Sequence, residues 1–182
     1  MRVLLGLLAV GTAMASPSDV PNDWQLQTDS ELHVAFRCPI GWKQVQAYRD
    51  RTYLEGRDRQ DSYLGYVQLL ASEGDSPARV CRGQATHKMQ PYGTHPRIQS
   101  MKIQGLRACL VWPSKERLDT GPIAGTARNA YQKNPDALLV VEYPRGTEID
   151  GQYGQLMIIA DKDHILRIGS TLRFLAAAKS GK

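Results

Sequence analysis

The residues of this chain that could do chemistry are few, and the densest group is the run Asp161-Lys162-Asp163-His164. Asp163 and His164 could act as an acid and a base, or bind a metal ion. The N-terminus of a helix, however, favours acidic residues, because its backbone N–H groups and its dipole attract negative charge. Capping explains both aspartates, so we interpret the run as a helix start and place His164 at the rim between sheet and helix.

Glu142, His87 and His95 are the other candidates. Glu142 lies in an otherwise apolar stretch, where a buried carboxylate would need a partner. The simpler interpretation is a strand end at which the side chain reaches water. His87 and His95 flank a Tyr-Gly turn, but metal binding needs a further ligand that the nearby sequence does not supply. We interpret both histidines as exposed, and we expect neither a metal ion nor a cofactor.

Sequence motifs of common enzyme classes are absent from the chain. It contains no Gly-x-Ser-x-Gly, no His-Glu-x-x-His, no phosphate-binding glycine loop and no dinucleotide fingerprint. Each of these motifs depends on particular residues at a fixed local spacing. Their absence argues against the corresponding enzymes, whereas a site assembled from distant residues stays an alternative.

Residues 1–15 have the layout of a secretory signal peptide. Arg2 precedes an apolar stretch at 3–10, and Ala13-Met14-Ala15 places small residues at the two positions that signal peptidase recognises. We expect cleavage after Ala15 and export to the periplasm or the cell exterior. No stretch reaches the ~20 apolar residues of a membrane-spanning helix, so we expect a soluble mature chain.

The charge of the chain bears on its partners. The formal net charge is +5, and removal of Arg2 with the signal peptide leaves +4. Basic and acidic residues alternate, as at Arg49-Asp50-Arg51, whereas nucleic-acid binders concentrate positive charge on one face with aromatic residues between. We therefore interpret the charges as a solvated surface and expect no nucleic-acid partner.

Three cysteines, Cys38, Cys81 and Cys109, leave at least one thiol without an intramolecular partner. The absence of Cys-x-x-Cys argues against a redox site or a zinc knuckle. Export permits a disulfide, and we expect Cys81–Cys109 if one forms, because Cys81 faces inward from a helix that precedes the strand of Cys109. Cys38 would then stay free. Three buried thiols are an equal alternative.

Hydrophobic patterning predicts a single domain at 30–175, between a linker at 16–29 and a flexible tail at 176–182. Alternation at 31–38 indicates a strand with one buried face. Further strands are expected at 42–48, 63–71, 97–104, 106–112, 137–143 and 154–160. We expect the first two strands to pair as a hairpin.

Helices are expected in two places. One begins at Ser76-Pro77 and ends at the turn formed by residues 91–93. The other follows Asp161, and its apolar residues Ile165, Ile168 and Leu172 share one face. Strands joined mainly by hairpins, with few helices, predict an α+β fold: a mainly antiparallel sheet flanked by helices.

Both ends of the expected domain resemble a known group. Phe36-Arg37-Cys38-Pro39-Ile40-Gly41-Trp42 opens the fold, and Ser170-Thr171-Leu172-Arg173-Phe174 closes it. These motifs resemble the PsbP/Mog1-like group of exported proteins, in which Tyr commonly stands at the position of Cys38. The resemblance implies a sandwich of antiparallel sheet and helices with an accessory, partner-binding role. We transfer no functional residues from it.

Two hypotheses of function follow. The first is an exported non-catalytic module that binds a protein partner or an envelope component, with Arg117, Arg128 and Glu142 as contact residues. They lie in or near the long irregular stretch 113–135, and such stretches often carry function. The second is an exported hydrolase or metal-dependent enzyme with a site near Glu142, His164 and the same stretch. We favour the first, and the sequence does not predict an oligomeric state.

Overall fold

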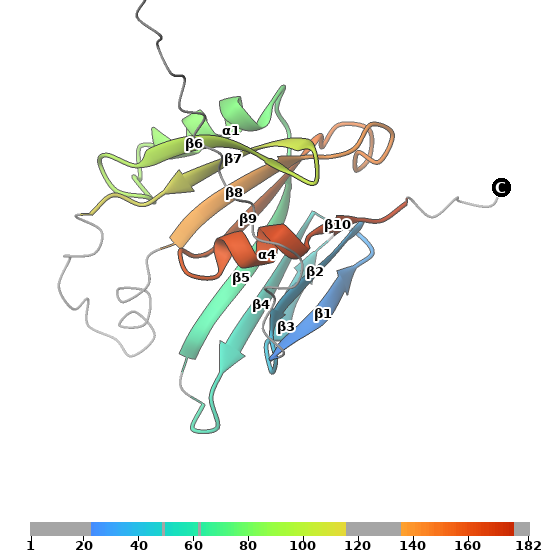
Figure 1. Ribbon diagram of the computed structural model, residues 1–182, viewed down its shortest axis with the longest axis vertical. Coiled ribbons are helices and arrows are strands. Elements are labelled where there is room, and N and C mark those ends of the chain that lie inside the picture. Colours follow the sequence, from blue (N-terminus) through green and yellow to red (C-terminus); the bar gives the residue numbers. More distant parts are fainter. Residues whose placement is uncertain (1–22, 49, 62, 116–135, 177–182) are drawn as a thin grey trace, which may run out of the picture.

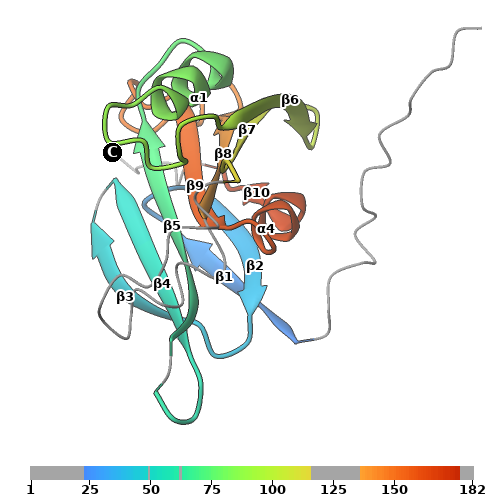
Figure 2. The same cartoon turned by 90° about the vertical axis from the view of Figure 1, so that its left-hand side faces the viewer.

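The computed structural model describes residues 23–48, 50–61, 63–115 and 136–176. These residues form a seven-stranded sheet, a three-stranded sheet and two helices (Figures 1 and 2). Every pair of neighbouring strands is antiparallel. The predicted α+β class with mainly antiparallel sheet is therefore confirmed.

The large sheet has the order β3-β4-β5-β9-β8-β7-β6. Its strands are β3 (Lys43–Tyr48), β4 (Arg51–Arg57), β5 (Tyr63–Ser72), β6 (Arg97–Ile103), β7 (Leu106–Trp112), β8 (Asp136–Glu142) and β9 (Gln155–Asp161). The central strands carry continuous apolar stretches, such as residues 137–141, because both faces of the sheet are covered there. β3 and β6 are the two edges.

The small sheet has the order β1-β2-β10, from β1 (Trp24–Asp29), β2 (Val34–Pro39) and β10 (Arg173–Phe174). The sequence predicts a hairpin between the strands expected at 31–38 and 42–48, and this prediction is wrong. β2 pairs with β1 and β10, whereas β3 pairs with β4 in the large sheet. Gly41, at a φ of +89°, turns the chain between the two sheets, a backbone conformation that favours glycine.

β1 also corrects the expected linker at 16–29, because residues 24–29 form a strand of the small sheet. Trp24 is buried, and the Asp29 carboxylate accepts hydrogen bonds from the Leu32 amide, at 2.8 Å, and from the Thr52 hydroxyl. The strand is mostly polar because it is an edge with few buried positions. Its two apolar residues, Trp24 and Leu26, give too little alternation to distinguish it from a loop.

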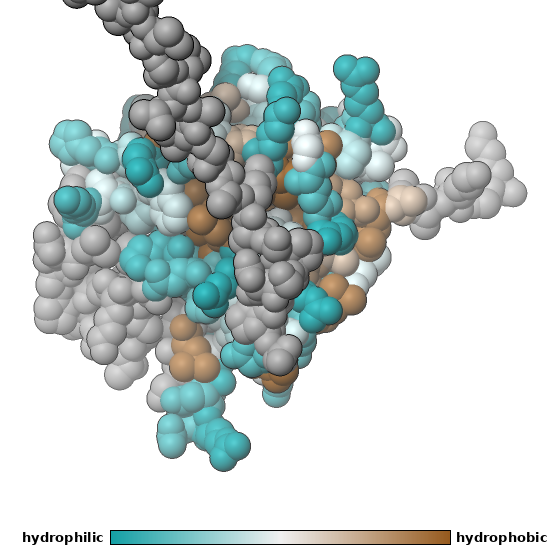
Figure 3. Space-filling model, viewed as in Figure 1, coloured by the Kyte–Doolittle hydropathy of each residue, from teal (hydrophilic) through white to brown (hydrophobic). Residues whose placement is uncertain are grey.

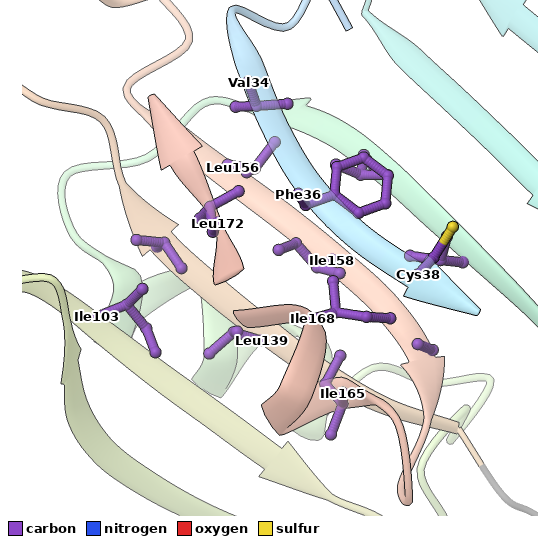
Figure 4. Packing of buried hydrophobic residues seen from close by; sticks show 14 of the residues in the cluster. Val34, Phe36, Cys38, Ile103, Leu139, Leu156, Ile158, Ile165, Ile168 and Leu172 are labelled. Carbon is purple, nitrogen blue, oxygen red and sulfur yellow. The ribbon is translucent and has the colours of Figure 1, made fainter. Parts of the chain in front are cut away.

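The main core lies between the large sheet, the small sheet and α4 (Ile165–Thr171) (Figure 4). The predicted apolar face of this helix is confirmed, because Ile165, Ile168 and Leu172 are fully buried. Gly169 lets the helix approach β8 closely: a Cβ atom there would come within 2.5 Å of the Leu139 side chain. The helix itself begins at Ile165, and a turn separates it from Asp161.

A smaller core lies on the opposite face, where α1 (Pro77–Ala85) packs on β6, β7 and β8. Ser76 caps this helix by accepting a hydrogen bond from the Arg79 amide, and Pro77 occupies its first turn, as the sequence predicts. The sulfur atoms of Cys81 and Cys109 lie at bonding distance and join α1 to β7, with a Cα–Cα separation of 6.4 Å. This pair is the one expected from the sequence.

α1 is shorter than predicted. The helix ends at Thr86, whose backbone leaves helical geometry and whose hydroxyl donates to the Arg82 carbonyl. Met89, within the predicted but not the observed helix, is 81% exposed. Neither helix of the described residues is long and apolar enough to span a membrane.

Candidate functional site

Glu142 ends β8 and forms an ion pair with Arg107 on the neighbouring strand β7. Arg107 Nε donates to Glu142 Oε2 at 2.7 Å, and a second donor of the guanidinium contacts Oε1, so the pair is bidentate. The hydrogen bonds from Arg107, together with its charge and that of Arg145, hold the pKa of Glu142 below its usual value despite some desolvation. Glu142 is therefore a partly exposed, ionised strand-end residue, as the sequence interpretation expects.

His164 is the other candidate, and it follows β9 closely in the chain. Its Nδ1 atom is 2.6 Å from the Asp161 carboxylate, and its ring contacts those of Trp24 and Trp42, with centroid distances of 5.8 and 5.6 Å. Asp161 Oδ1 also accepts hydrogen bonds from the amides of Asp163 and His164, which stabilises the turn before α4. The arrangement ties the small sheet to the large one.

Trp42 explains two glycines of this cluster. A Cβ atom at Gly56 would meet the Trp42 indole at 2.2 Å, and one at Gly65 would meet it at 3.1 Å. The indole therefore lies flat across β4 and β5, where only glycine leaves room. The rings of Trp24, Trp42 and His164, the Asp161 carboxylate and the two glycines form a cluster that connects the two sheets, with His164 at its centre.

The structure keeps the predicted catalytic candidates apart. β8 and β9 pair so that Glu142 faces Gln155, whereas Asp136 faces Asp161. Glu142 and His164 thus lie near opposite ends of this strand pair, about 20 Å apart at ~3.4 Å per residue. Asp163 pairs with Lys162 at 2.6 Å, on the surface.

The other two candidate histidines, His87 and His95, are exposed. His87 Nδ1 accepts a hydrogen bond from the Met89 amide at 3.2 Å, and His95 Nδ1 lies 2.8 Å from the Thr94 hydroxyl. Among the described residues, no group of three or more His, Cys, Asp or Glu side chains is placed to hold a metal ion.

Arg117 and Arg128, the other predicted contact residues, lie outside the described residues. The strands that border their stretch are β7 and β8. At the start of β8 the Tyr66 hydroxyl donates to Asp136 at 2.7 Å. Burial, and to a lesser degree the charge of Asp136, raise the pKa of the nearby Tyr92, so this tyrosine stays neutral over a wide pH range.

One feature of the surface escaped the sequence interpretation. The segment 76–115, which we call the basic segment, contains seven of the 23 Lys and Arg residues and none of the 18 Asp and Glu residues. The rest of the chain holds the other 16 basic residues against all 18 acidic ones, so the net positive charge of the protein resides in this segment. Its cations are Arg79, Arg82, Lys88, Arg97, Lys102, Arg107 and Lys115.

The basic segment forms α1, β6 and β7, which adjoin in the structure. Its cations are exposed, and the ion pairs of the described residues engage Arg79 with Asp75 and Arg107 with Glu142. Figure 3 shows that hydrophilic side chains predominate on one face of the molecule and that hydrophobic ones form small separate patches. Counting acids and bases by segment, rather than by total and by local alternation, would have found this feature.

Comparison with known proteins gives structural similarity alone. The chain matches no protein-family model and none of the curated proteins compared with it. It is similar in structure to cyanobacterial PsbP (CyanoP) from Synechocystis sp. PCC 6803, with a TM-score of 0.48 and 13% identity over 91% of this chain and 98% of that chain. The sequence motifs at the two ends of the domain resemble the same PsbP-like group.

A crystal structure from Bacteroides thetaiotaomicron VPI-5482 is also similar, with a TM-score of 0.40 and 8% identity. The similarity covers 88% of this chain and 50% of that one.

Proposed function

We propose that this protein is an exported, soluble, non-catalytic module that acts by binding a protein partner or an envelope component. The observation that carries the proposal is the charge of the basic segment, which contains no acidic residue and whose seven cations are exposed on adjoining elements. Arg79 and Arg107 pair with Asp75 and Glu142 outside the segment, and no ion pair is seen for the other five among the described residues. A surface of one sign attracts a partner of the opposite sign and speeds their association.

Export is the second part of this proposal, and it depends on residues 1–15. A signal peptide cleaved after Ala15 leaves Ser16 as the mature N-terminus. Intact-mass measurement of the protein recovered outside the cytoplasm is expected to give the mass of residues 16–182. A recovered protein that retains Met1 would contradict it.

The binding test uses a partner identified by cross-linking in the exported fraction and then purified. Its affinity is measured for the wild type and for a variant carrying Arg82→Glu and Lys88→Glu. Both side chains are exposed, and reversing their charge is expected to weaken binding on the order of tenfold or more, mainly through slower association. A matched variant, Lys43→Glu with Arg167→Glu, changes the net charge equally at exposed sites outside the basic segment and should bind like the wild type.

Arg117, Arg128 and Glu142 enter the same test as proposed contact residues. Arg117→Ala with Arg128→Ala is expected to weaken the interaction while leaving the melting temperature nearly unchanged. If the matched variant, Lys43→Glu with Arg167→Glu, loses as much affinity as Arg82→Glu with Lys88→Glu, the basic segment is rejected as the binding surface. Hydrolytic or metal-dependent turnover that His164→Ala abolishes would reject the non-catalytic module.

A further inference from the structure

β6 is an edge of the large sheet, and it differs from the opposite edge. Among the described strands it pairs with β7 alone, in continuous register from Arg97 opposite Trp112 to Ile103 opposite Leu106. β3, the other edge, has a register shift between Gln44 and Gln46. Bulges of this kind twist an edge and discourage further pairing, and β6 has none.

The turn that joins β6 to β7 determines which backbone groups of β6 face outward. Gln104 and Gly105 form a two-residue turn, with φ values of +51° and +82°. Such a turn makes its flanking pair, Ile103 and Leu106, a hydrogen-bonded pair, and hydrogen-bonded pairs then alternate along the ladder. The N–H and C=O groups of Ile98, Ser100 and Lys102 therefore point away from β7, toward the open side of the sheet.

Cations lie on both faces of this edge. Arg97 lies over the Trp112 ring, 5.9 Å from its centroid, on the side of the main core. Lys102 alternates with the residues of that face and is opposite Arg107, on the side of α1. Residues 97–100 are all exposed, so the edge is open along more than half of its length.

We propose that β6 receives an extended, acidic segment of a partner protein, which adds to the large sheet as a further strand. This inference rests on the proposed function and specifies its partner. Backbone groups of the incoming segment would bond to those of Ile98, Ser100 and Lys102. Its acidic side chains would alternate between the two faces and meet Arg97 on one and Lys102 on the other.

A second copy of this chain fits the edge less well. Pairing β6 with β6 would bring two sets of Arg97 and Lys102 together, and this like-charge contact opposes association. An anionic lipid surface matches the charges, but its headgroups do not form the regular row of donors and acceptors that a strand edge presents. The acidic segment satisfies both the charge and the backbone pattern.

The probes are two synthetic peptides of the length of β6, seven residues. One has the pattern Val-Glu-Glu-Val-Val-Glu-Glu, which places glutamate on both faces of a strand, and the other has lysine in place of each glutamate. The purified chain is titrated with each peptide at low ionic strength, and amide hydrogen exchange is followed by NMR. The glutamate peptide is expected to bind and to slow exchange at Ile98, Ser100 and Lys102. The lysine peptide should leave these amides unchanged. Binding of the glutamate peptide without protection of β6 amides, or no binding at millimolar peptide, would overturn the proposal.

Variants of β6 separate the backbone from the charge. Ser100→Pro removes one outward N–H without touching the ladder to β7, a position where edge strands tolerate proline. It is expected to weaken peptide binding about five- to tenfold, the equivalent of one hydrogen bond. Lys102→Glu keeps the backbone and is expected to weaken binding on the order of tenfold. It also tests the site if Ser100→Pro does not fold. Lys43→Glu, on the opposite edge, is the matched control, and an effect equal to that of Lys102→Glu would reject β6 as the site.

The other occupants give different results. Dimerisation of the peptide-free chain that Ser100→Pro abolishes would assign the edge to a second copy, and displacement of the peptide by anionic vesicles would assign it to a lipid surface. Either result contradicts the proposal. If the purified partner binds the Ser100→Pro and Lys102→Glu variants like the wild type, the strand-addition proposal fails while the proposed binding function stands. If no partner binds the wild type, the proposed function fails.

Discussion

Cys38 is the residue whose burial has the clearest chemical consequence. Its side chain is fully buried in the main core, and this burial raises the pKa of the thiol to about 11, although Gln25 and Gln27 partly offset the rise by hydrogen bonding. The thiolate is the reactive form of cysteine. The free cysteine of this protein is therefore protected twice, by exclusion of reagents and by protonation.

We expect Cys38 to resist alkylation in the folded protein. Iodoacetamide at neutral pH should leave it unmodified in the native state and modify it fully in denaturant without reductant, as measured by mass spectrometry. Peptide mapping of the unreduced protein should find Cys81 and Cys109 linked. Rapid native labelling of Cys38 would contradict the buried placement.

The same group makes stability depend on pH. The pKa of Cys38 is higher in the folded state than its reference value of 9.0, so its contribution to stability is complete below pH 9 and is lost as the pH rises through about 11. Burial raises the pKa of Tyr143 in the same direction. We expect the free energy of unfolding, measured with urea, to fall above pH 9. Ionisation of Cys38 accounts for a loss on the order of 2 kcal/mol by pH 11, and Cys38→Ala should remove this part of the decrease.

At the scale of elements, α4 depends on a narrow apolar face. Ile168 is fully buried, whereas Arg167 beside it is exposed. Ile168→Ala is expected to lower the free energy of unfolding by about 2–5 kcal/mol, because it leaves a cavity between α4 and the sheet. Arg167→Ala and Lys162→Ala should change it by less than about 0.5 kcal/mol. If all three substitutions lowered the melting temperature equally, a different face of the helix would be the buried one.

The elements also show what the sequence could predict. The alternation of Leu32, Val34, Phe36 and Cys38 marks a buried strand face, because the period of two is a property of the strand itself. The partner of that strand is not a local property. Gly41 can equally close a hairpin or direct the chain into another sheet, and Trp42 decides the outcome by packing across glycines of β4 and β5.

The candidate site was harder to predict for a similar reason. Glu142 was interpreted correctly, since a strand end depends on neighbours in the sequence. The capping role expected for both aspartates was wrong: Asp161 stabilises a turn before α4 and Asp163 pairs with Lys162, whereas the N-cap residue of α4 is His164, which makes no side-chain capping bond. The contact between His164 and the two tryptophans joins residues from three distant parts of the chain, and no local spacing records it. The basic segment was visible in the sequence, but total charge and short alternations concealed it.

At the scale of the whole molecule, one covalent link joins the layer of α1 to the large sheet. Cys81 and Cys109 are 28 positions apart, and closing such a loop stabilises a fold by about 3–4 kcal/mol in the chain-entropy model. Cys81→Ala with Cys109→Ala is therefore expected to lower the melting temperature substantially, as measured by calorimetry. An unchanged melting temperature would show that packing of α1 alone fixes this layer.

The small sheet contains strands from both ends of the described chain, since β2 pairs with β1 on one side and with β10 on the other. The Arg37 amide likewise donates to the Thr171 hydroxyl across a separation of 134 residues. Pairing between such distant segments is slow to form, because loop-closure entropy opposes it until most other contacts exist. A nascent chain can close this sheet only after nearly all of the domain has been synthesised. In the export that we propose for this protein, such a topology delays folding and so lengthens the time in which the unfolded polypeptide can pass through a translocation channel.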